Sequence, residues 1–171
     1  MNEQTSHASA WDVLLYGDFM SRTKFNVDRD CSDRTHNGIT FDSKVEMWYY
    51  RDVVLPGVES GNIAKYELQK SYVLQPKFVH NGSMVREIVY VADFYIQYSD
   101  GHEEVIDIKG FPDSVAKLKR KLFWYVYPEI TYKWLSYVKK YDGWIEYDER
   151  ARLKRAEKKM NKKETEENGR D

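Results

Sequence analysis

Residues 84–109, MVREIVYVADFYIQYSDGHEEVIDIK, decide the fold of this chain. Two runs in this stretch are rich in β-branched and aromatic side chains, a composition that favours β-strands. Ser-Asp-Gly-His at 99–102 separates the runs and supplies a turn, so we expect an antiparallel hairpin. Each run contains one carboxylate among apolar neighbours, Asp93 in the first and Asp107 in the second. Pairing across the turn predicts that these carboxylates come close together on adjacent strands.

A helix is predicted upstream of the hairpin, in FDSKVEMWYYRDVVLP at residues 41–56. Ser43 precedes Glu46 by three positions, which is the capping-box pattern of a helix N-terminus. Pro56-Gly57 is expected to end the helix. The other expected elements are extended chain at 66–78, an amphipathic helix at 114–127, a strand at 130–138 and a charged helix at 147–163. We therefore expect a mixed α/β (α+β) fold of order αβββαβ, with a central mixed sheet flanked by helices.

The length of 171 residues predicts one domain, and 42% hydrophobic and 15% aromatic content can fill its core. This composition excludes extended disorder for most of the chain. No run of about 18 apolar residues is present, so we expect no membrane partner. The N-terminus has neither a basic nor an apolar signal region, which predicts a cytoplasmic protein. The single cysteine, Cys31, excludes an internal disulfide and a cysteine-cluster zinc site.

Charge is divided unequally along the chain, although the formal net charge is only −1. Residues 1–108 carry 10 basic and 17 acidic side chains, whereas residues 109–163 carry 16 basic and 7 acidic ones. A basic half in a nearly neutral chain indicates nucleic acid as a partner, although charge alone is better explained by a solvated basic helix at the C-terminus. The expected organisation is an N-terminal extension (1–38), a core domain (39–146) and a basic C-terminal helix with a charged tail (147–171).

Four residues form a candidate site: Glu46, Asp93, Asp107 and Lys109. A carboxylate within an apolar strand is costly to bury unless it is paired or binds a metal ion. Asp107 and Lys109 are two positions apart, so they lie on the same face of their strand. Two converging carboxylates repel each other without a cation, and such hard oxygen ligands suit Mg²⁺ or Mn²⁺. Glu46 adds a third acid, although its capping position gives it an alternative, structural role.

This set of residues resembles the PD-(D/E)xK nuclease superfamily. Its pattern is an acid on the first helix, an Asp on the second strand and (D/E)-x-K on the third, matched here by Glu46, Asp93 and Asp107-Ile108-Lys109. The blocks FDSKVE, LQPKF, VREIVYVADF, VIDIKGF and KLKRKLFWYVYP are similar to those of an uncharacterised nuclease-like family of bacteriophages and prophages. The resemblance covers about half of the chain, roughly residues 39–128. One departure is Ala92, which stands where the superfamily pattern has Pro.

The resemblance implies a restriction-endonuclease-like core and a Mg²⁺-dependent (or Mn²⁺-dependent) DNA endonuclease that hydrolyses phosphodiester bonds. Asp93, Asp107 and the Ile108 carbonyl would hold the metal, with Glu46 as a direct or water-mediated ligand. Lys109 would orient or help to deprotonate the attacking water, and it would stabilise charge on the phosphate.

DNA binding is assigned to basic side chains. The candidates are Arg86 at the start of the Asp93 strand and four residues of the 114–127 helix, Lys117, Lys119, Arg120 and Lys121. Residues 150–163 carry eight basic side chains and one acidic one; a solvated helix is as well supported as a DNA-gripping arm or a dimerisation helix. Gln75 is a further polar candidate for the metal site, and a strand-end amide beside Pro76 is an equally supported role.

Similar phage nucleases act on branched or recombination intermediates, often as homodimers, so the preferred specialisation is resolution of Holliday junctions in the host cytoplasm. A restriction-like nuclease acting on duplex DNA is the rival within the enzyme class. The second class is a non-catalytic DNA-binding or protein-interaction module on the same fold, which would be expected to lose one of the four site positions. A plain structural protein would leave the two aspartates unexplained.

Overall fold

A five-stranded mixed sheet forms the centre of the computed structural model, which describes residues 31–168. The strand order is β11-β10-β9-β8-β3, with β3 (Ile63–Leu68), β8 (Phe94–Tyr98), β9 (Glu103–Ile108), β10 (Thr131–Val138) and β11 (Gly143–Glu146). β9 and β10 are parallel, and every other neighbouring pair in this sheet is antiparallel. Of the predicted N-terminal extension 1–38, residues 1–30 lie outside the described residues.

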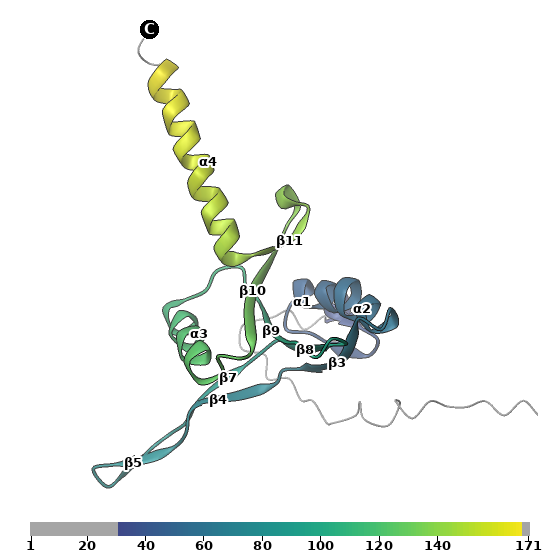
Figure 1. The fold of residues 1–171 in the computed structure, drawn as a ribbon, viewed down its shortest axis with the longest axis vertical. Helices are drawn as coiled ribbons and strands as arrows, with labels where there is room; N and C mark the ends of the chain where they lie inside the picture. The colour runs from purple at the N-terminus through teal and green to yellow at the C-terminus, as the bar shows by residue number, and fades with distance from the viewer. Residues whose placement is uncertain (1–30, 169–171) are drawn as a thin grey trace, which may run out of the picture.

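Helices cover both faces of this sheet (Figure 1). On one face lies a continuous helical segment made of α1 (Lys44–Tyr49), a π-helical turn (Tyr50–Val54) and α2 (Leu55–Glu59). On the other face lies α3 (Ser114–Val126), whose Phe123 is fully buried. β9 supplies both layers because alternate side chains face opposite sides of a sheet: Ile106 belongs to the first buried cluster and Val105 to the second. The prediction of an α+β fold with a central mixed sheet flanked by helices is confirmed.

The expected end of the first helix at Pro56-Gly57 is wrong, because the helical segment continues to Glu59. The π-helical turn changes the hydrogen-bond register immediately before Pro56. Pro56 therefore lies in the first turn of a new helical piece, where its missing N–H is tolerated. The segment closes at Ser60, whose amide donates to the Pro56 carbonyl at 2.9 Å.

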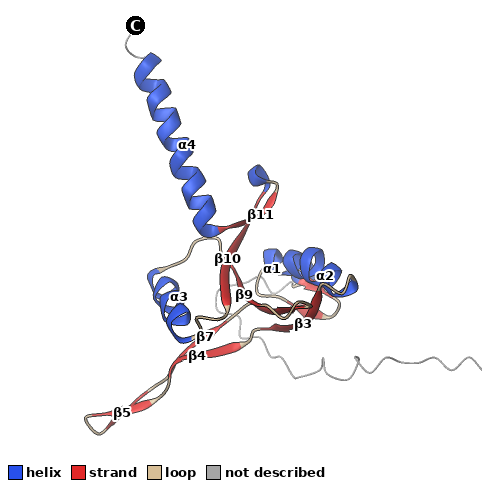
Figure 2. Ribbon diagram, viewed as in Figure 1, coloured by secondary structure: helices blue, strands red, loops and turns tan. Residues whose placement is uncertain are grey.

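A two-stranded ribbon projects from the sheet (Figure 2). β4 (Ser71–Gln75) pairs with β7 (Ile88–Val91), and farther out β5 (Phe78–His80) pairs with β6 (Ser83–Val85). The run 84–98, expected as one strand, is therefore divided among β6, β7 and β8. The chain passes from the ribbon into the sheet at Ala92 and Asp93, which belong to no strand. The Ala92 amide donates to the Lys70 carbonyl at 2.9 Å, which holds this crossing in place.

The described chain begins with a short hairpin. A 3₁₀ turn (Ser32–Arg34) precedes β1 (Thr35–His36) and β2 (Ile39–Thr40). Asn37 and Gly38 join these strands with positive φ values of 51° and 78°, as expected of an Asn-Gly turn. Residues on both sides of the expected boundary between 38 and 39 thus belong to one hairpin.

A long helix, α4 (Tyr147–Asn168), extends away from the sheet beside β11 (Figure 1). It ends at Asn168 rather than at residue 163 as predicted. Glu157 attaches it to the 3₁₀ turn between β10 and β11 (Lys139–Tyr141): the Tyr141 hydroxyl donates to this carboxylate at 3.2 Å, and Lys140 forms an ion pair with it at 2.7 Å. Within residues 31–168, no helix combines the length and the apolar character needed to cross a membrane.

Gly57→Ala is expected to destabilise the domain. A Cβ at this position would lie 2.5 Å from Ile63 Cδ1 and 2.8 Å from Ile63 Cγ1, and Ile63 is buried. Overpacking of this kind costs about 1–3 kcal/mol, which exceeds the gain in helix propensity of up to ~1 kcal/mol. Chemical denaturation measures the change in the free energy of unfolding.

Ile63→Val provides the control, since it deletes the Cδ1 atom that lies nearest to the added methyl group. Gly57→Ala should therefore cost less in the Ile63→Val background than in the wild-type protein. Equal costs in the two backgrounds would mean that this contact does not select glycine at position 57.

Candidate functional site

Asp93 and Asp107 lie beside each other near the end of β9. The register of β8 and β9 pairs Phe94 with Ile106, so the next residues along, Asp93 and Asp107, face each other across the two chain segments. The Ile108 amide donates a hydrogen bond to Asp93 Oδ2 at 2.7 Å. The β8–β9 hairpin thus brings together two carboxylates that the sequence places on separate strands.

Asp107 is 1% exposed, and its two carboxylate oxygens differ in their surroundings. Oδ2 forms an ion pair with Lys109 Nζ at 2.7 Å and accepts a hydrogen bond from the Tyr132 hydroxyl at 3.3 Å. Oδ1 is buried and has no hydrogen-bond partner in the described part of the chain. A buried carboxylate oxygen without a donor is costly, so Asp107 is placed to accept one further donor or a cation.

Tyr132 and Trp134 hold Asp107 from β10, and the sequence reasoning missed both of them. Trp134 Nε1 donates to the Tyr132 hydroxyl at 2.7 Å, and this hydroxyl donates to Asp107. The parallel register places Trp134 next to Asp107. Two features of the sequence could have indicated this role. Residues 132 and 134 share one face of the predicted strand 130–138. A helix separates this strand from the Asp107 strand, and two strands joined through a helix are often parallel neighbours.

Glu46 is buried in the first turn of α1, where capping and electrostatic roles coincide. The Ser43 hydroxyl accepts from the Glu46 amide at 3.2 Å and donates to Glu46 Oε1 at 2.7 Å. The predicted helix cap is therefore present, with the serine hydroxyl in contact with the glutamate carboxylate. The Glu46 charge also acts on Asp93 and Lys109, raising the pKa of both.

Asp93 and Glu46 resist ionisation. Burial raises the pKa of the Asp93 carboxyl well above its usual range, and the charges of Asp107 and Glu46 raise it further. Burial also raises the pKa of Glu46, although the hydrogen bond from Ser43 opposes this effect. Three carboxylates therefore lie close enough that each added negative charge is unfavourable.

Lys109 supplies the positive charge of the cluster. Burial by itself would lower the pKa of the Lys109 ammonium, but the carboxylates of Asp107, Asp93 and Glu46 outweigh burial, and the pKa is raised. The side chain is therefore protonated at neutral pH. In this state it can donate hydrogen bonds and stabilise negative charge, and it cannot accept a proton.

The chemistry of these residues fits a divalent cation. Mg²⁺ and Mn²⁺ prefer carboxylate oxygens, and Asp107 Oδ1 is a buried oxygen with no donor in the described chain. Among residues 31–168, no three acidic, histidine or cysteine side chains are already arranged as a metal cage. Lys109 occupies the other oxygen of Asp107, so a bound cation would share this carboxylate with the lysine.

Two of the predicted DNA contacts are engaged within the protein. Lys119 Nζ donates to a backbone carbonyl of β7 at 2.7 Å. Arg120 forms an ion pair with Asp148 at 2.7 Å, and its guanidinium lies over the rings of Trp124 and Trp134, 4.5 and 4.3 Å from their centroids. These side chains connect α3 to the ribbon and to the start of α4.

The other three predicted DNA contacts, Arg86, Lys117 and Lys121, are exposed. Lys117 and Lys121 lie one turn apart on α3. The structure does not bring Gln75 to the carboxylates, since it pairs with Ile88 on the ribbon. Asp93 lies five positions after Ile88, a distance of roughly 16 Å when extended.

Sequence comparison supplies a family but no activity. A family model described as "Protein of unknown function (DUF1064)" matches residues 24–143. The chain belongs to this family. Nothing among curated proteins or solved structures matches the chain. The DUF1064 match contains the whole carboxylate cluster and the ribbon, whereas α4 lies beyond it.

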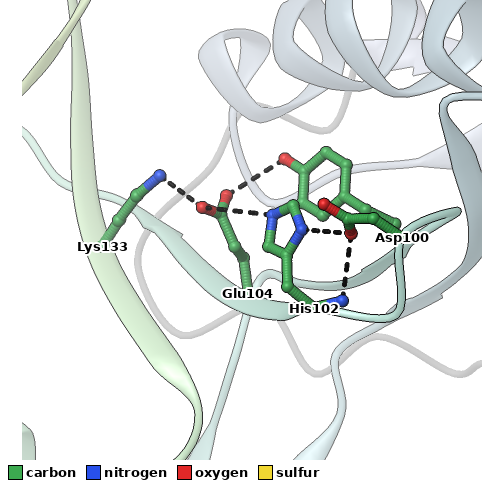
Figure 3. A network of polar contacts seen from close by, with 5 residues as sticks. Asp100, His102, Glu104 and Lys133 are labelled. Carbon is green, nitrogen blue, oxygen red and sulfur yellow. Dashed lines mark hydrogen bonds and ion pairs between the residues drawn. The ribbon is translucent and has the colours of Figure 1, made fainter.

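A second polar cluster of the DUF1064 domain lies at the opposite end of β9 (Figure 3). Glu104 Oε1 forms an ion pair with Lys133 and lies 4.0 Å from His102 Nε2, and Oε2 accepts from the Tyr98 hydroxyl at 3.0 Å. The His102 ring stacks on Tyr98 and contacts Asp100. Both oxygens of Glu104 are thus partnered, which makes this cluster a link between β8, β9 and β10 rather than a site with unused ligands.

Asp93→Asn is expected to raise the thermal stability of the metal-free protein at neutral and alkaline pH. Because the folded-state pKa of Asp93 is raised, the stability that its protonated form contributes is present below about pH 4 and is lost as pH rises through the folded pKa. Asparagine does not ionise and can still accept from the Ile108 amide. At pH 8 the free energy of unfolding should exceed that of wild type by about 1 kcal/mol, which corresponds to a rise in melting temperature of a few degrees. Near pH 4 the two melting temperatures should be equal.

Glu104→Gln is the matched control, because it neutralises a carboxylate on the same sheet that is fully paired. It should lower stability by about 1–2 kcal/mol, since Lys133 loses its ionic partner. If Asp93→Asn also lowered the melting temperature at pH 8, repulsion among the site carboxylates would not be a destabilising feature of this protein.

Proposed function

We propose that this protein is a Mg²⁺- or Mn²⁺-dependent DNA endonuclease with a restriction-endonuclease-like core. The observation that carries the proposal is the buried Asp107, one oxygen of which has no hydrogen-bond partner among residues 31–168, and which lies beside Asp93 and Lys109. The chain order of the helix 44–59, β3, β8, β9, α3 and β10 supports the expected order αβββαβ. Asp93 directly precedes the second of these strands, Asp107 lies near the end of the third, and Lys109 directly follows the third.

The acidic side chains and one backbone group would hold the cation: Asp93, Asp107, Glu46 and the Ile108 carbonyl. When bound, such an ion acts as a Lewis acid toward the phosphate and makes a coordinated water more acidic. The protein contributes orientation. The Ile108 amide donates to Asp93, and the Tyr132 hydroxyl donates to Asp107, so each carboxylate is held in a defined orientation.

Lys109 is assigned the role of positioning the attacking water and stabilising the negative charge that develops on the phosphate. The neighbouring carboxylates raise the pKa of the Lys109 ammonium against the effect of burial in the metal-free protein, so the side chain carries its positive charge before a cation binds. The ion pair with Asp107 Oδ2 holds the ammonium next to the carboxylates.

Branched DNA is the preferred substrate within this proposal. The exposed basic side chains lie on three separate features: Arg86 on the projecting ribbon, Lys117 and Lys121 on α3 beside the sheet, and Arg152, Lys154, Arg155, Lys158, Lys159 and Lys162 on the projecting α4 (Figure 1). Such a distribution suits a junction whose arms diverge better than one straight duplex. A homodimer, which would place two sites on two strands, is part of the proposal, and sedimentation analysis measures it.

The central test is cleavage of a four-way junction, a flap, a linear duplex and single strands with Mg²⁺ or Mn²⁺. Asp107→Ala and Lys109→Met should each reduce the rate by about 100-fold or more, because each removes charge from the reacting centre. Lys133→Met is the matched control, since this lysine pairs with Glu104 in the second cluster, and it should cut at the wild-type rate.

Two results would contradict the proposal: no cleavage of any of these substrates by the wild-type protein, or undiminished cleavage by the Asp107 and Lys109 variants. DNA binding without cleavage would favour the alternative of a non-catalytic DNA-binding module.

Removal of residues 158–171 is expected to weaken DNA binding and to flatten its dependence on salt. The deletion removes Lys158, Lys159, Lys162 and Lys163 but leaves Glu157 and its contacts with β10–β11 intact. Each phosphate contact that is lost should reduce the slope of log K against log salt by about 1. An unchanged slope would mean that α4 does not contact DNA and would favour a role in solubility or dimerisation.

A further inference from the structure

The outer part of the ribbon, residues 77–86, presents apolar side chains to solvent; we call it the arm. Val79 and Met84 pair directly across β5 and β6 and are 64% and 61% exposed, and Phe78 is 45% exposed. Asn81 and Gly82 turn the chain with φ values of 48° and 76°, which is the geometry of a tight two-residue hairpin turn. The arm therefore holds an apolar pair in a fixed register close to its end.

This exposed pair does not help the chain to fold. A solitary two-stranded hairpin is only marginally stable in water, and apolar side chains on an open ribbon promote association. Polar residues would serve a purely structural ribbon better. The composition of the arm therefore indicates contact with a partner.

Charge defines the chemistry of this partner. Residues 69–86 contain no aspartate or glutamate. Lys77 and Arg86 flank the base of the arm and are exposed. A second copy of the arm would carry the same positive charge and be repelled. A partner with anionic groups outside and apolar surfaces inside is complementary, and duplex nucleic acid, with outer phosphates and stacked bases, has this arrangement.

We propose that the arm is a wedge that inserts Val79 and Met84 at a weakly stacked or branched DNA step while Lys77 and Arg86 bind the flanking phosphates. Proteins that kink DNA combine apolar wedges with neighbouring cationic side chains in this way. The inference rests on the proposed function for its substrate, but it concerns a different part of the molecule.

The ribbon connects this wedge to the carboxylate cluster. β7 leads from the arm to Asp93, which lies nine positions after Met84, so the two residues are at most about 30 Å apart. This distance is slightly less than one turn of B-DNA, about 34 Å. The wedge and the cluster can therefore contact the same DNA molecule, and the wedge would favour distorted or branched DNA over a regular duplex.

The test uses full-length protein carrying Asp107→Ala, so that DNA is bound without being cut, and a four-way junction with 2-aminopurine at the branch. At saturating protein, 2-aminopurine fluorescence should rise several-fold, because an unstacked base is less quenched. Adding Val79→Ser and Met84→Ser should abolish this rise and weaken binding by about tenfold. Adding Val115→Ser and Leu118→Ser instead, at positions of α3 that are 58% and 57% exposed, is the matched control and should preserve the rise.

The outcomes separate the wedge from the nuclease. The arm variant is the Asp107→Ala protein that also carries Val79→Ser and Met84→Ser. If it unstacks and binds the junction as well as the Asp107→Ala protein does, the wedge is refuted, even where the protein with an intact Asp107 cuts DNA. A change in sedimentation of the arm variant with no change in DNA binding also refutes the wedge, because the arm would then be a protein–protein contact. Arm-dependent unstacking by a protein whose wild-type form cuts no substrate supports the wedge and refutes the proposed nuclease.

Discussion

The ion pair between Lys109 and Asp107, at 2.7 Å, makes it possible to bury the charge of Asp107 inside the sheet. Three segments meet around this pair: β9 carries Asp107 and runs directly into Lys109, the crossing from the ribbon supplies Asp93, and β10 supplies Tyr132. The pair satisfies one carboxylate oxygen and leaves the other without a donor in the described chain. An unsatisfied buried oxygen is unfavourable for folding and is available to a ligand.

The two acidic clusters at the ends of β9 differ in how fully their carboxylates are partnered. Glu104 has partners on β8 and β10 for both oxygens, so it contributes to the sheet and has little capacity for a ligand. Asp107 and Asp93 raise the electrostatic energy of the opposite end, where Asp93 resists ionisation. Unfavourable electrostatic interactions of this kind are typical of functional sites. Burial of the surrounding aromatic and aliphatic side chains offsets their cost in folding free energy.

The sequence predicted the parts of this structure that depend on local pattern. The turn at 99–102 and the apolar runs around it were sufficient to bring Asp93 and Asp107 together, because hairpin pairing follows from strand composition and turn chemistry. The helix cap at Ser43 and Glu46 followed from spacing alone.

The rest depends on contacts between segments that are distant in the chain. The hydrogen bonds from Tyr132 to Asp107 and from Trp134 to Tyr132 require the parallel register of β9 and β10, which no local pattern specifies. Charge counting likewise could not reveal that Lys119 and Arg120 are engaged by β7 and Asp148. One further consequence follows from Trp134, which donates to Tyr132, lies beneath the Arg120 guanidinium and packs against Tyr147 at the start of α4. A single indole ring thus supports both the carboxylate cluster and the root of the projecting helix, so a substitution that displaces it would perturb the two together.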